Sequence, residues 1–181
     1  MNNIFKMTII TSLLVMTAGA YAASPSATVQ ISGTVMPTTN NCKLVVPTTV
    51  DLGSVALEDF VSVPAASEFQ AKPLVVNISD CNPGQVVQIH ISGTQDNDNQ
   101  HMFANATTEG SAINAGVVIH EHVNGAINVV TPDGGNVTQD VIDANGDAKH
   151  DFTVSMTPTR DDMDPTQGSI STSATIVLEA V

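Results

Sequence analysis

Few residues of this chain have the types and spacing that catalysis or metal binding requires. His120 and His122 alternate in a segment with a β-strand pattern, so their imidazoles lie on one face, about 7 Å apart. Such a pair binds a metal ion only if a third ligand converges on it. No cysteine or further histidine stands at a clear spacing, so we expect two solvated strand residues and no bound metal or other cofactor.

The acidic segment DANGDAKHD, residues 143–151, offers several oxygen ligands. It lacks the glycine placement and the closing glutamate of a calcium-binding EF-hand loop. A type I′ hairpin turn at Asn145-Gly146 explains the segment more simply. The sequence also contains no nucleophile elbow, phosphate-binding loop or zinc-protease motif, so we expect a protein that is not an enzyme.

The N-terminus has the pattern of a secretory signal peptide. Lys6 precedes an apolar run over residues 9–15, and Ala20-Tyr21-Ala22 is an A-x-A cleavage site. The apolar run is shorter than the roughly 20 residues that span a bilayer. We expect cleavage after residue 22, which leaves 159 of the 181 residues, enough for one domain with a sizeable core.

The cysteines and the charge balance fit an exported protein. Cys42 and Cys81 are the only two cysteines, and an even count in an oxidising compartment favours a disulfide between them. A metal site is disfavoured because C-x-x-C spacing and adjacent histidines are missing. The chain has 18 acidic and 5 basic residues, for a formal net charge of −13, so nucleic acid is a poor partner.

Short runs with period-two alternation of apolar residues occur along the exported chain. In residues 72–79, for example, Leu74, Val76 and Ile78 fall on one face. The other runs are residues 27–35, 85–93, 116–123, 126–130, 150–158 and 168–181. A hairpin turn is predicted at Asn124-Gly125, and one helical turn is expected within residues 55–69, before Pro64.

These short strands, separated by turn residues, predict an all-β fold, a β-sandwich of immunoglobulin-like size. The sandwich is expected to be a variant, because the chain has no tryptophan and its single tyrosine leaves with the signal peptide. Both the core tryptophan and the tyrosine corner of an ordinary immunoglobulin domain are therefore missing.

The run ATVQISGTV, residues 27–35, contains a glycine on its apolar face. Val29, Ile31, Gly33 and Val35 fall on one side of the predicted strand. A glycine inside a strand weakens it and usually marks a bulge or the close approach of another backbone. The partner of this strand is therefore expected to come unusually close at Gly33.

Taken in order, several segments resemble the subunits of chaperone-usher (type 1-like) pili, the fimbrial surface fibres of bacteria. They are the signal peptide, VQISGTV, Cys42, VDLGSV, LVVNISDCNPG, VQIHISG, NAGVVIHEHVNGAINV and GSISTSATIVLEAV. Each segment is weak alone, but the ordered set with the cysteine pair covers nearly the whole exported chain and is fairly specific.

The resemblance implies an incomplete immunoglobulin-like β-sandwich, the pilin fold, that lacks its last strand and leaves an open apolar groove. It divides the chain into a signal peptide (1–22), an N-terminal donor-strand extension (23–38) and a pilin domain (39–181). The extension would complete the sandwich of a neighbouring subunit, a form of β-strand addition. The residues implied to fill the neighbour's groove are Ala27, Val29, Ile31, Gly33 and Val35.

The resemblance also implies partners and a location. They are neighbouring pilus subunits, a periplasmic chaperone and an outer-membrane usher, with export through the periplasm to a surface fimbrium that contributes to adhesion. The closing strand, with Ile176, Leu178 and Ala180 toward the groove, would border the acceptor site where the chaperone docks. Family members commonly carry an aromatic penultimate residue, whereas this chain has Ala180.

Two alternatives stay open at this point. In the first, the protein is a secreted, complete β-sandwich binding module, and residues 27–35 form an ordinary first strand of its own fold. In the second, it is a periplasmic metal-binding or catalytic protein that uses His120 and His122.

Overall fold

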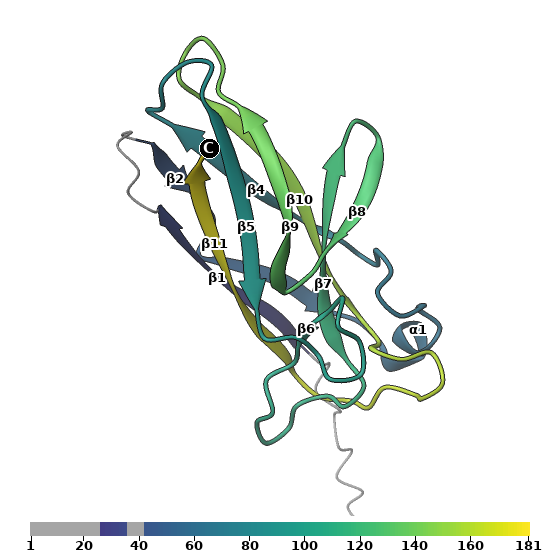
Figure 1. The fold of residues 1–181 in the computed structure, drawn as a ribbon. Coiled ribbons are helices and arrows are strands. Elements are labelled where there is room, and N and C mark those ends of the chain that lie inside the picture. Colours follow the sequence, from purple (N-terminus) through teal and green to yellow (C-terminus); the bar gives the residue numbers. More distant parts are fainter. Residues whose placement is uncertain (1–25, 36–41) are drawn as a thin grey trace, which may run out of the picture.

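The structure, a computed structural model, describes residues 26–35 and 42–181, without the side chains at positions 26, 34, 35, 136, 137 and 180. The predicted signal peptide 1–22 and the predicted boundary between residues 38 and 39 lie outside these ranges. Two β-sheets pack face to face (Figure 1). The elements are β1 (Ser26–Val35), β2 (Lys43–Val45), β3 (Thr49–Ser54), α1 (Leu57–Val61), β4 (Lys72–Ser79), β5 (Val86–Gly93), β6 (Phe103–Ala104), β7 (Gly116–Val123), β8 (Ala126–Val130), β9 (Asp133–Val141), β10 (Ala148–Thr157) and β11 (Ile170–Ala180).

The first sheet has the strand order β3-β1-β11-β5-β9, and the second has the order β2-β4-β10-β7-β6. Strand β8 pairs only with β7 and extends from the second sheet as one arm of a hairpin. The all-β sandwich predicted from the alternation pattern is therefore confirmed.

The core forms where the alternating apolar residues of the two sheets face each other. Leu74 and Val76 of β4 are fully buried, and so are the inward residues Val87 of β5 and Val154 of β10. Polar neighbours such as Asn77 point to solvent, as expected for a sheet with one buried face. The burial of side chains at every second position fixes the register of each strand, because a one-residue slip would expose the whole set.

The predicted helical turn is α1, five residues long, which ends before Pro64. Its buried side chain is Phe60, which anchors it to the end of the sandwich. In the described part of the chain, no helix is long and apolar enough to cross a membrane. The predicted type I′ hairpin is also present, since Asn124 and Gly125 both have positive φ, 51° and 79°, between β7 and β8.

The prediction of a type I′ hairpin at Asn145-Gly146 is wrong. Only Gly146 has a positive φ, 89°, and the strands that flank this turn, β9 and β10, belong to different sheets. Asp143 organises the turn, because its Oδ1 accepts backbone N–H bonds from Asn145 and Asp147 at 2.8 and 3.0 Å. A side chain at Gly146 would place its Cβ 2.7 Å from the carbonyl oxygen of Cys81, so glycine lets the turn lie against that segment.

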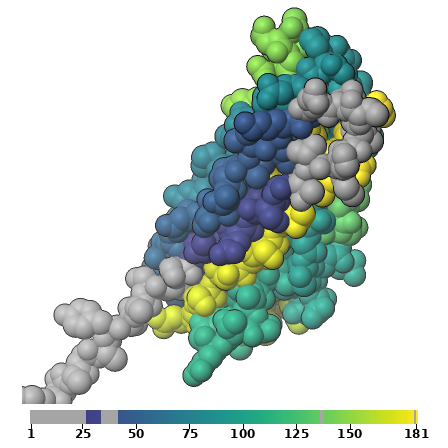
Figure 2. All heavy atoms as spheres, turned by 90° about the vertical axis from the view of Figure 1, so that its left-hand side faces the viewer, coloured from purple at the N-terminus to yellow at the C-terminus, as the bar shows by residue number. Residues whose placement is uncertain are grey.

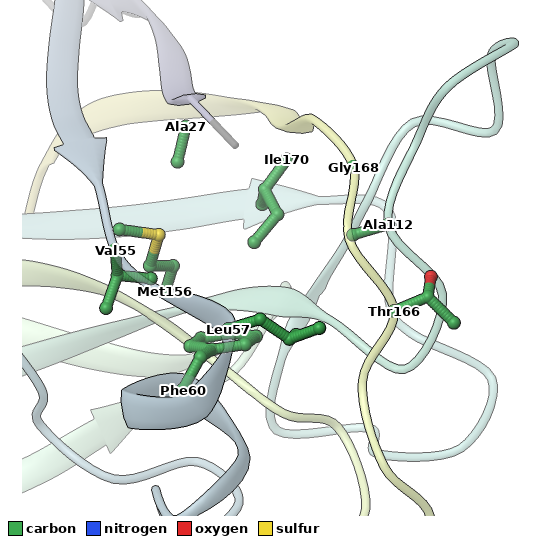
Figure 3. Close-up of a pocket in the computed structure, with 9 residues that line it drawn as sticks. All are labelled: Ala27, Val55, Leu57, Phe60, Ala112, Met156, Thr166, Gly168 and Ile170. Carbon is green, nitrogen blue, oxygen red and sulfur yellow. The ribbon is translucent and has the colours of Figure 1, made fainter. Parts of the chain in front are cut away.

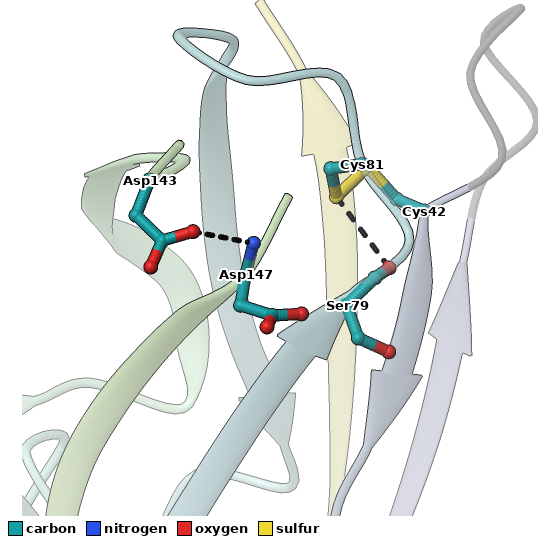
Figure 4. The surroundings of a disulfide bond; sticks show 5 residues. All are labelled: Cys42, Ser79, Cys81, Asp143 and Asp147. Atoms are coloured by element: carbon teal, nitrogen blue, oxygen red, sulfur yellow. Dashed lines mark hydrogen bonds between the residues drawn. A yellow bond between two sulfur atoms is a disulfide. The ribbon is translucent and has the colours of Figure 1, made fainter. Parts of the chain in front are cut away.

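Cys42 and Cys81 form a disulfide with a Cα–Cα distance of 4.4 Å (Figure 4). The bond joins the residue before β2 to the segment that follows β4, at the end of the sandwich where the turn around Gly146 lies. Since β2 has only three residues, the disulfide holds it against β4 more firmly than its short ladder alone.

We expect the double variant Cys42→Ser/Cys81→Ser to lose about 4 kcal/mol of unfolding free energy, because the bond closes a loop across 39 residues of sequence. Urea unfolding followed by circular dichroism measures the loss. The wild-type protein unfolded with a reducing agent is the control and should match the variant. Equal stability of the oxidised and reduced wild-type protein would contradict the expectation.

Candidate functional site: the groove between β3 and β11

The groove of the first sheet lies between β3 and β11, and in this chain β1 fills it. Strand β1 pairs parallel to β11, from Ala27 opposite Ile170 to Val35 opposite Leu178, and antiparallel to β3. Figure 2 shows β1, in purple, between the blue strand β3 and the yellow strand β11 on one face of the molecule. The N-terminal strand of the single chain thus completes the sheet of the same chain.

The inward side chains of β1 are part of the hydrophobic core. Ala27 and Val29 are 0% exposed and Ile31 is 4% exposed, whereas Gln30 and Ser32 face solvent. The Ser32 hydroxyl lies 3.2 Å from Thr175 Oγ1 on β11, so one polar pair joins the strands on the outer face. The side chain of Val35 lies outside the described part, although its backbone belongs to β1.

Both walls of the groove contribute buried apolar side chains. On β11, Ile176 and Leu178 are 0% and 2% exposed, and on β3 Val50 and Leu52 are also buried. The backbone of Ala180 pairs with that of Val87 of β5, whereas its side chain lies outside the described part of the structure. The structure therefore places the two described members of the predicted wall beside β1. Sequence reasoning did not assign the β3 wall, although the alternation of VDLGSV contains it.

Gly33 lies under two side chains, one from β2 of the other sheet and one from the residue that follows β2. A Cβ at Gly33 would lie 2.9 Å from Val46 Cγ2 and 3.2 Å from Leu44 Cδ2. Contacts this short require the neighbours to move, so a larger residue at position 33 would push β1 away from these side chains. The predicted close approach involves side chains of and just after β2, not another backbone, and the sequence did not identify Leu44 or Val46 as its source.

A small apolar cavity of about 10 Å³ lies at the other end of β1, next to Ala27. Its lining includes Phe60 of α1, Met156 of β10 and Ile170 at the start of β11, and Figure 3 shows these side chains around the space next to the short Ala27 side chain. Because Ala27 carries only a methyl group, this end of the groove is filled less completely than the part that Ile31 occupies.

The histidine pair lies elsewhere, on β7 in the second sheet. The expectation of two solvated histidines is wrong for His120, which is 5% exposed. Burial lowers its pKa despite the nearby charge of Glu68. The imidazole of His122 contacts Glu68 at 3.0 Å and Thr153 at 3.0 Å. Within residues 26–35 and 42–181, no three histidine, cysteine or acidic side chains are arranged to hold a metal ion.

Several solved structures share this fold at low sequence identity. The P pilus rod subunit PapA is 15% identical, with a TM-score of 0.56 over 77% of this chain and 99% of its own. A chaperone-usher pilus structure that reveals the molecular basis of rod uncoiling gives 13% identity and a TM-score of 0.58, covering 81% and 91%. The CupB6 tip adhesin from Pseudomonas aeruginosa gives 12% and 0.50, covering 82% of this chain and 41% of the adhesin.

Sequence comparison assigns the family. No curated protein sequence matches this chain significantly. The family model described as "Fimbrial protein" matches residues 29–180, which include most of β1, both walls of the groove and both cysteines. The chain, a two-sheet sandwich whose groove is closed by its own N-terminal strand, therefore belongs to the fimbrial protein family.

Proposed function

We propose that this fimbrial structural subunit polymerises by donor-strand exchange. In the fibre, residues 27–35 of one subunit would leave their own groove and fill the groove between β3 and β11 of the next subunit. The same inward face, with Ala27, Val29, Ile31, Gly33 and Val35, would enter the neighbour. Residues 23–38 serve as the donor extension and residues 39–181 as the pilin domain.

The observation that carries this proposal is the position of β1. It is inserted between two strands of one sheet, so its removal exposes the buried walls on β3 and β11 together with their backbone groups. An open groove of this kind combines unpaired backbone groups with apolar surface, which favours binding of any strand with a matching pattern. A neighbouring copy carries such a strand at its N-terminus.

Strand direction gives a physical reason for exchange. In the single chain, β1 runs parallel to β11 over nine paired residues. Parallel ladders are slightly less stable per residue than antiparallel ones. A neighbour's strand that enters antiparallel to β11 would make this nine-residue ladder antiparallel, but it would run parallel to β3, with which β1 pairs antiparallel over five residues. The exchange would therefore improve the longer ladder at the expense of the shorter one, and the single-chain arrangement would serve as a stored form of the subunit.

We further infer a periplasmic chaperone and an outer-membrane usher as partners during export to the cell surface. Whenever β1 is outside its own groove, that groove needs protection from indiscriminate strand addition. Ile176, Leu178 and Ala180 on β11 are the residues proposed to face a chaperone strand. A pull-down of the subunit from periplasm that yields a one-to-one complex with a single partner supports this part, and the recovery of free subunit alone contradicts it.

One observation favours a second candidate, a secreted and complete β-sandwich binding module. With β1 in its own groove, the sheet of the single chain has no missing strand. The two candidates differ in whether β1 can leave its groove and enter another molecule. A strand-exchange measurement therefore separates them.

We expect a chain that lacks residues 23–38 to capture β1 from outside. When it is refolded with a synthetic peptide of residues 26–35, it should unfold cooperatively on heating, and without the peptide it should aggregate or unfold without cooperativity. Incubation of the same domain with the full exported chain should yield a one-to-one heterodimer by size-exclusion chromatography.

A peptide with Ile31→Asp is the matched control, because it would bury an unpaired charge and should give no stabilisation. If the shortened chain is equally stable with and without the wild-type peptide, the groove does not need a strand and the complete-module candidate gains. The same holds if the full chain never transfers its strand.

We expect Gly33→Leu to lower the unfolding free energy of the full exported chain by about 1 to 3 kcal/mol, as overpacking typically does. The cause is the contact with Val46 and Leu44, so Val46→Ala in the same chain should recover part of the loss. Urea unfolding at neutral pH measures both effects. A Gly33→Leu chain as stable as the wild type would contradict the packing described for this position.

A further inference from the structure

A buried cluster of polar side chains lies between the two sheets, away from the groove. Its centre is His150 on β10, whose side chain is 7% exposed. Glu121 of β7 and Asp140 of β9 approach the imidazole, and their side chains are 14% and 20% exposed. Since β9 belongs to the first sheet and the other two strands to the second, the cluster connects the sheets.

The register of β9 explains why polar groups face inward here. Thr138 and Asp140 pair with Ile89 and Val87 of β5, whose side chains point into the core. Residues directly opposite each other on paired strands share a face of the sheet. The inner face of β9 therefore carries a hydroxyl and a carboxylate, while Val141 on the opposite face is 69% exposed.

The two ring nitrogens of His150 contact different carboxylates. Nε2 lies 3.0 Å from Glu121 Oε1, and Nδ1 lies 3.2 Å from Asp140 Oδ2. A neutral imidazole has one N–H donor, so one of its nitrogens would face a carboxylate with a lone pair. The protonated ring has a donor on each side and suits both contacts. Both carboxylates are within ion-pair distance, and the Nε2 contact with Glu121 is an ion pair that is not aligned as a hydrogen bond. The two flanking negative charges therefore favour the imidazolium form.

Other contacts keep the cluster in place. The Thr138 hydroxyl donates a hydrogen bond to Glu121, so β9 contributes two of its four polar members. The ring of Phe152 lies 4.7 Å from the His150 ring, centroid to centroid. The charged neighbours of His150 on its own strand, Lys149 and Asp151, are exposed and pair with each other at 2.9 Å. Beside His150 on β4 stands the uncharged Val76.

We propose that His150, Glu121 and Asp140 form a proton-dependent clamp that holds the edge strand β9 of the first sheet against the second sheet. With His150 protonated, the clamp is two ion pairs that bridge the sheets. When His150 loses its proton, two carboxylates remain near a ring that can satisfy one of them, and the connection between the sheets weakens.

The electrostatics of the site agree with this geometry. Burial alone would lower the pKa of His150, but the hydrogen bond and charge of Asp140 and the charge of Glu121 outweigh it and raise the pKa above the usual 6.5. A histidine with a raised pKa in the folded state contributes stability below pH 6.5 that is lost as the pH rises through the folded-state pKa. The clamp is therefore strongest in mildly acidic solution.

His120 provides an internal comparison of opposite sign. Its pKa is lowered, mainly by burial. His120 therefore contributes stability above pH 6.5, and this stability is lost as the pH falls below 6.5 through the folded-state pKa. The pH dependence of the whole protein contains both contributions, and only a comparison of variants separates them.

The test uses the full exported chain and three variants, His150→Gln, Glu121→Gln and His120→Gln. Urea unfolding from pH 5.5 to 8.5 gives the unfolding equilibrium constant of each. The ratio of the His150→Gln constant to the wild-type constant should fall as the pH rises through the folded-state pKa of His150, because the wild-type protein alone loses the contribution of the clamp there. The corresponding ratio for His120→Gln should rise with pH.

A second readout does not depend on the stability of the His150 variant. Nuclear magnetic resonance titration of the wild-type imidazole protons should give a pKa above 6.5 for His150, and Glu121→Gln should lower it. A His150 pKa at or below 6.5 overturns the proposal. So does a ratio of unfolding constants for His150→Gln that stays flat over the whole pH range.

Discussion

The burial of β1 between β3 and β11 is the contact on which the rest of this structure depends. Val29 and Ile31 contribute to the same core as Ile176 of β11, so the strand closes the hydrophobic interior as well as the sheet. Full burial of each such side chain stabilises by roughly 1.5 to 3 kcal/mol. A domain whose stability is typically about 5 to 15 kcal/mol cannot lose this strand without a substitute.

The position of β1 in the chain is compatible with its replacement by an identical strand from another molecule. It is the first described element of the chain, and its partner β11 is the last, so the sheet pairs the first described strand with the last one. The remaining strands are connected by their own ladders, and the disulfide at Cys42 fixes the point where the domain begins again after β1. Exchange of β1 thus changes one strand and leaves the covalent framework of the domain as it is.

Much of the fold could be predicted from the sequence, because side-chain alternation and turn chemistry are local. Leu74, Val76 and Ile78 are buried as predicted, and Asn124-Gly125 forms the predicted turn. The error at Asn145-Gly146 arose because alternation identifies a strand but not the sheet that it joins. Residues 27–35 pose a related problem. Their pattern predicts a strand with one apolar face, and the resemblance implies that this strand fills a groove. A groove of the same chain and a groove of an identical neighbour, however, present the same residues to it.

The polar cluster was missed for a different reason. Glu121, Asp140 and His150 come from three strands and meet only when the sheets pack, so no spacing in the sequence marks them. The cue that was present is the polar character of Thr138 and Asp140 at positions where an edge strand of a sandwich usually carries apolar residues.

The short strands at the edges of the second sheet affect how readily copies of this protein aggregate when they are crowded together. The second sheet ends in β2, with three residues, on one side, and in β6, with two residues, and β8, with five, on the other, so its edge strands are short. Short borders are one way in which proteins prevent sideways sheet growth and aggregation. Growth of the second sheet into flat, amyloid-like ribbons is therefore disfavoured.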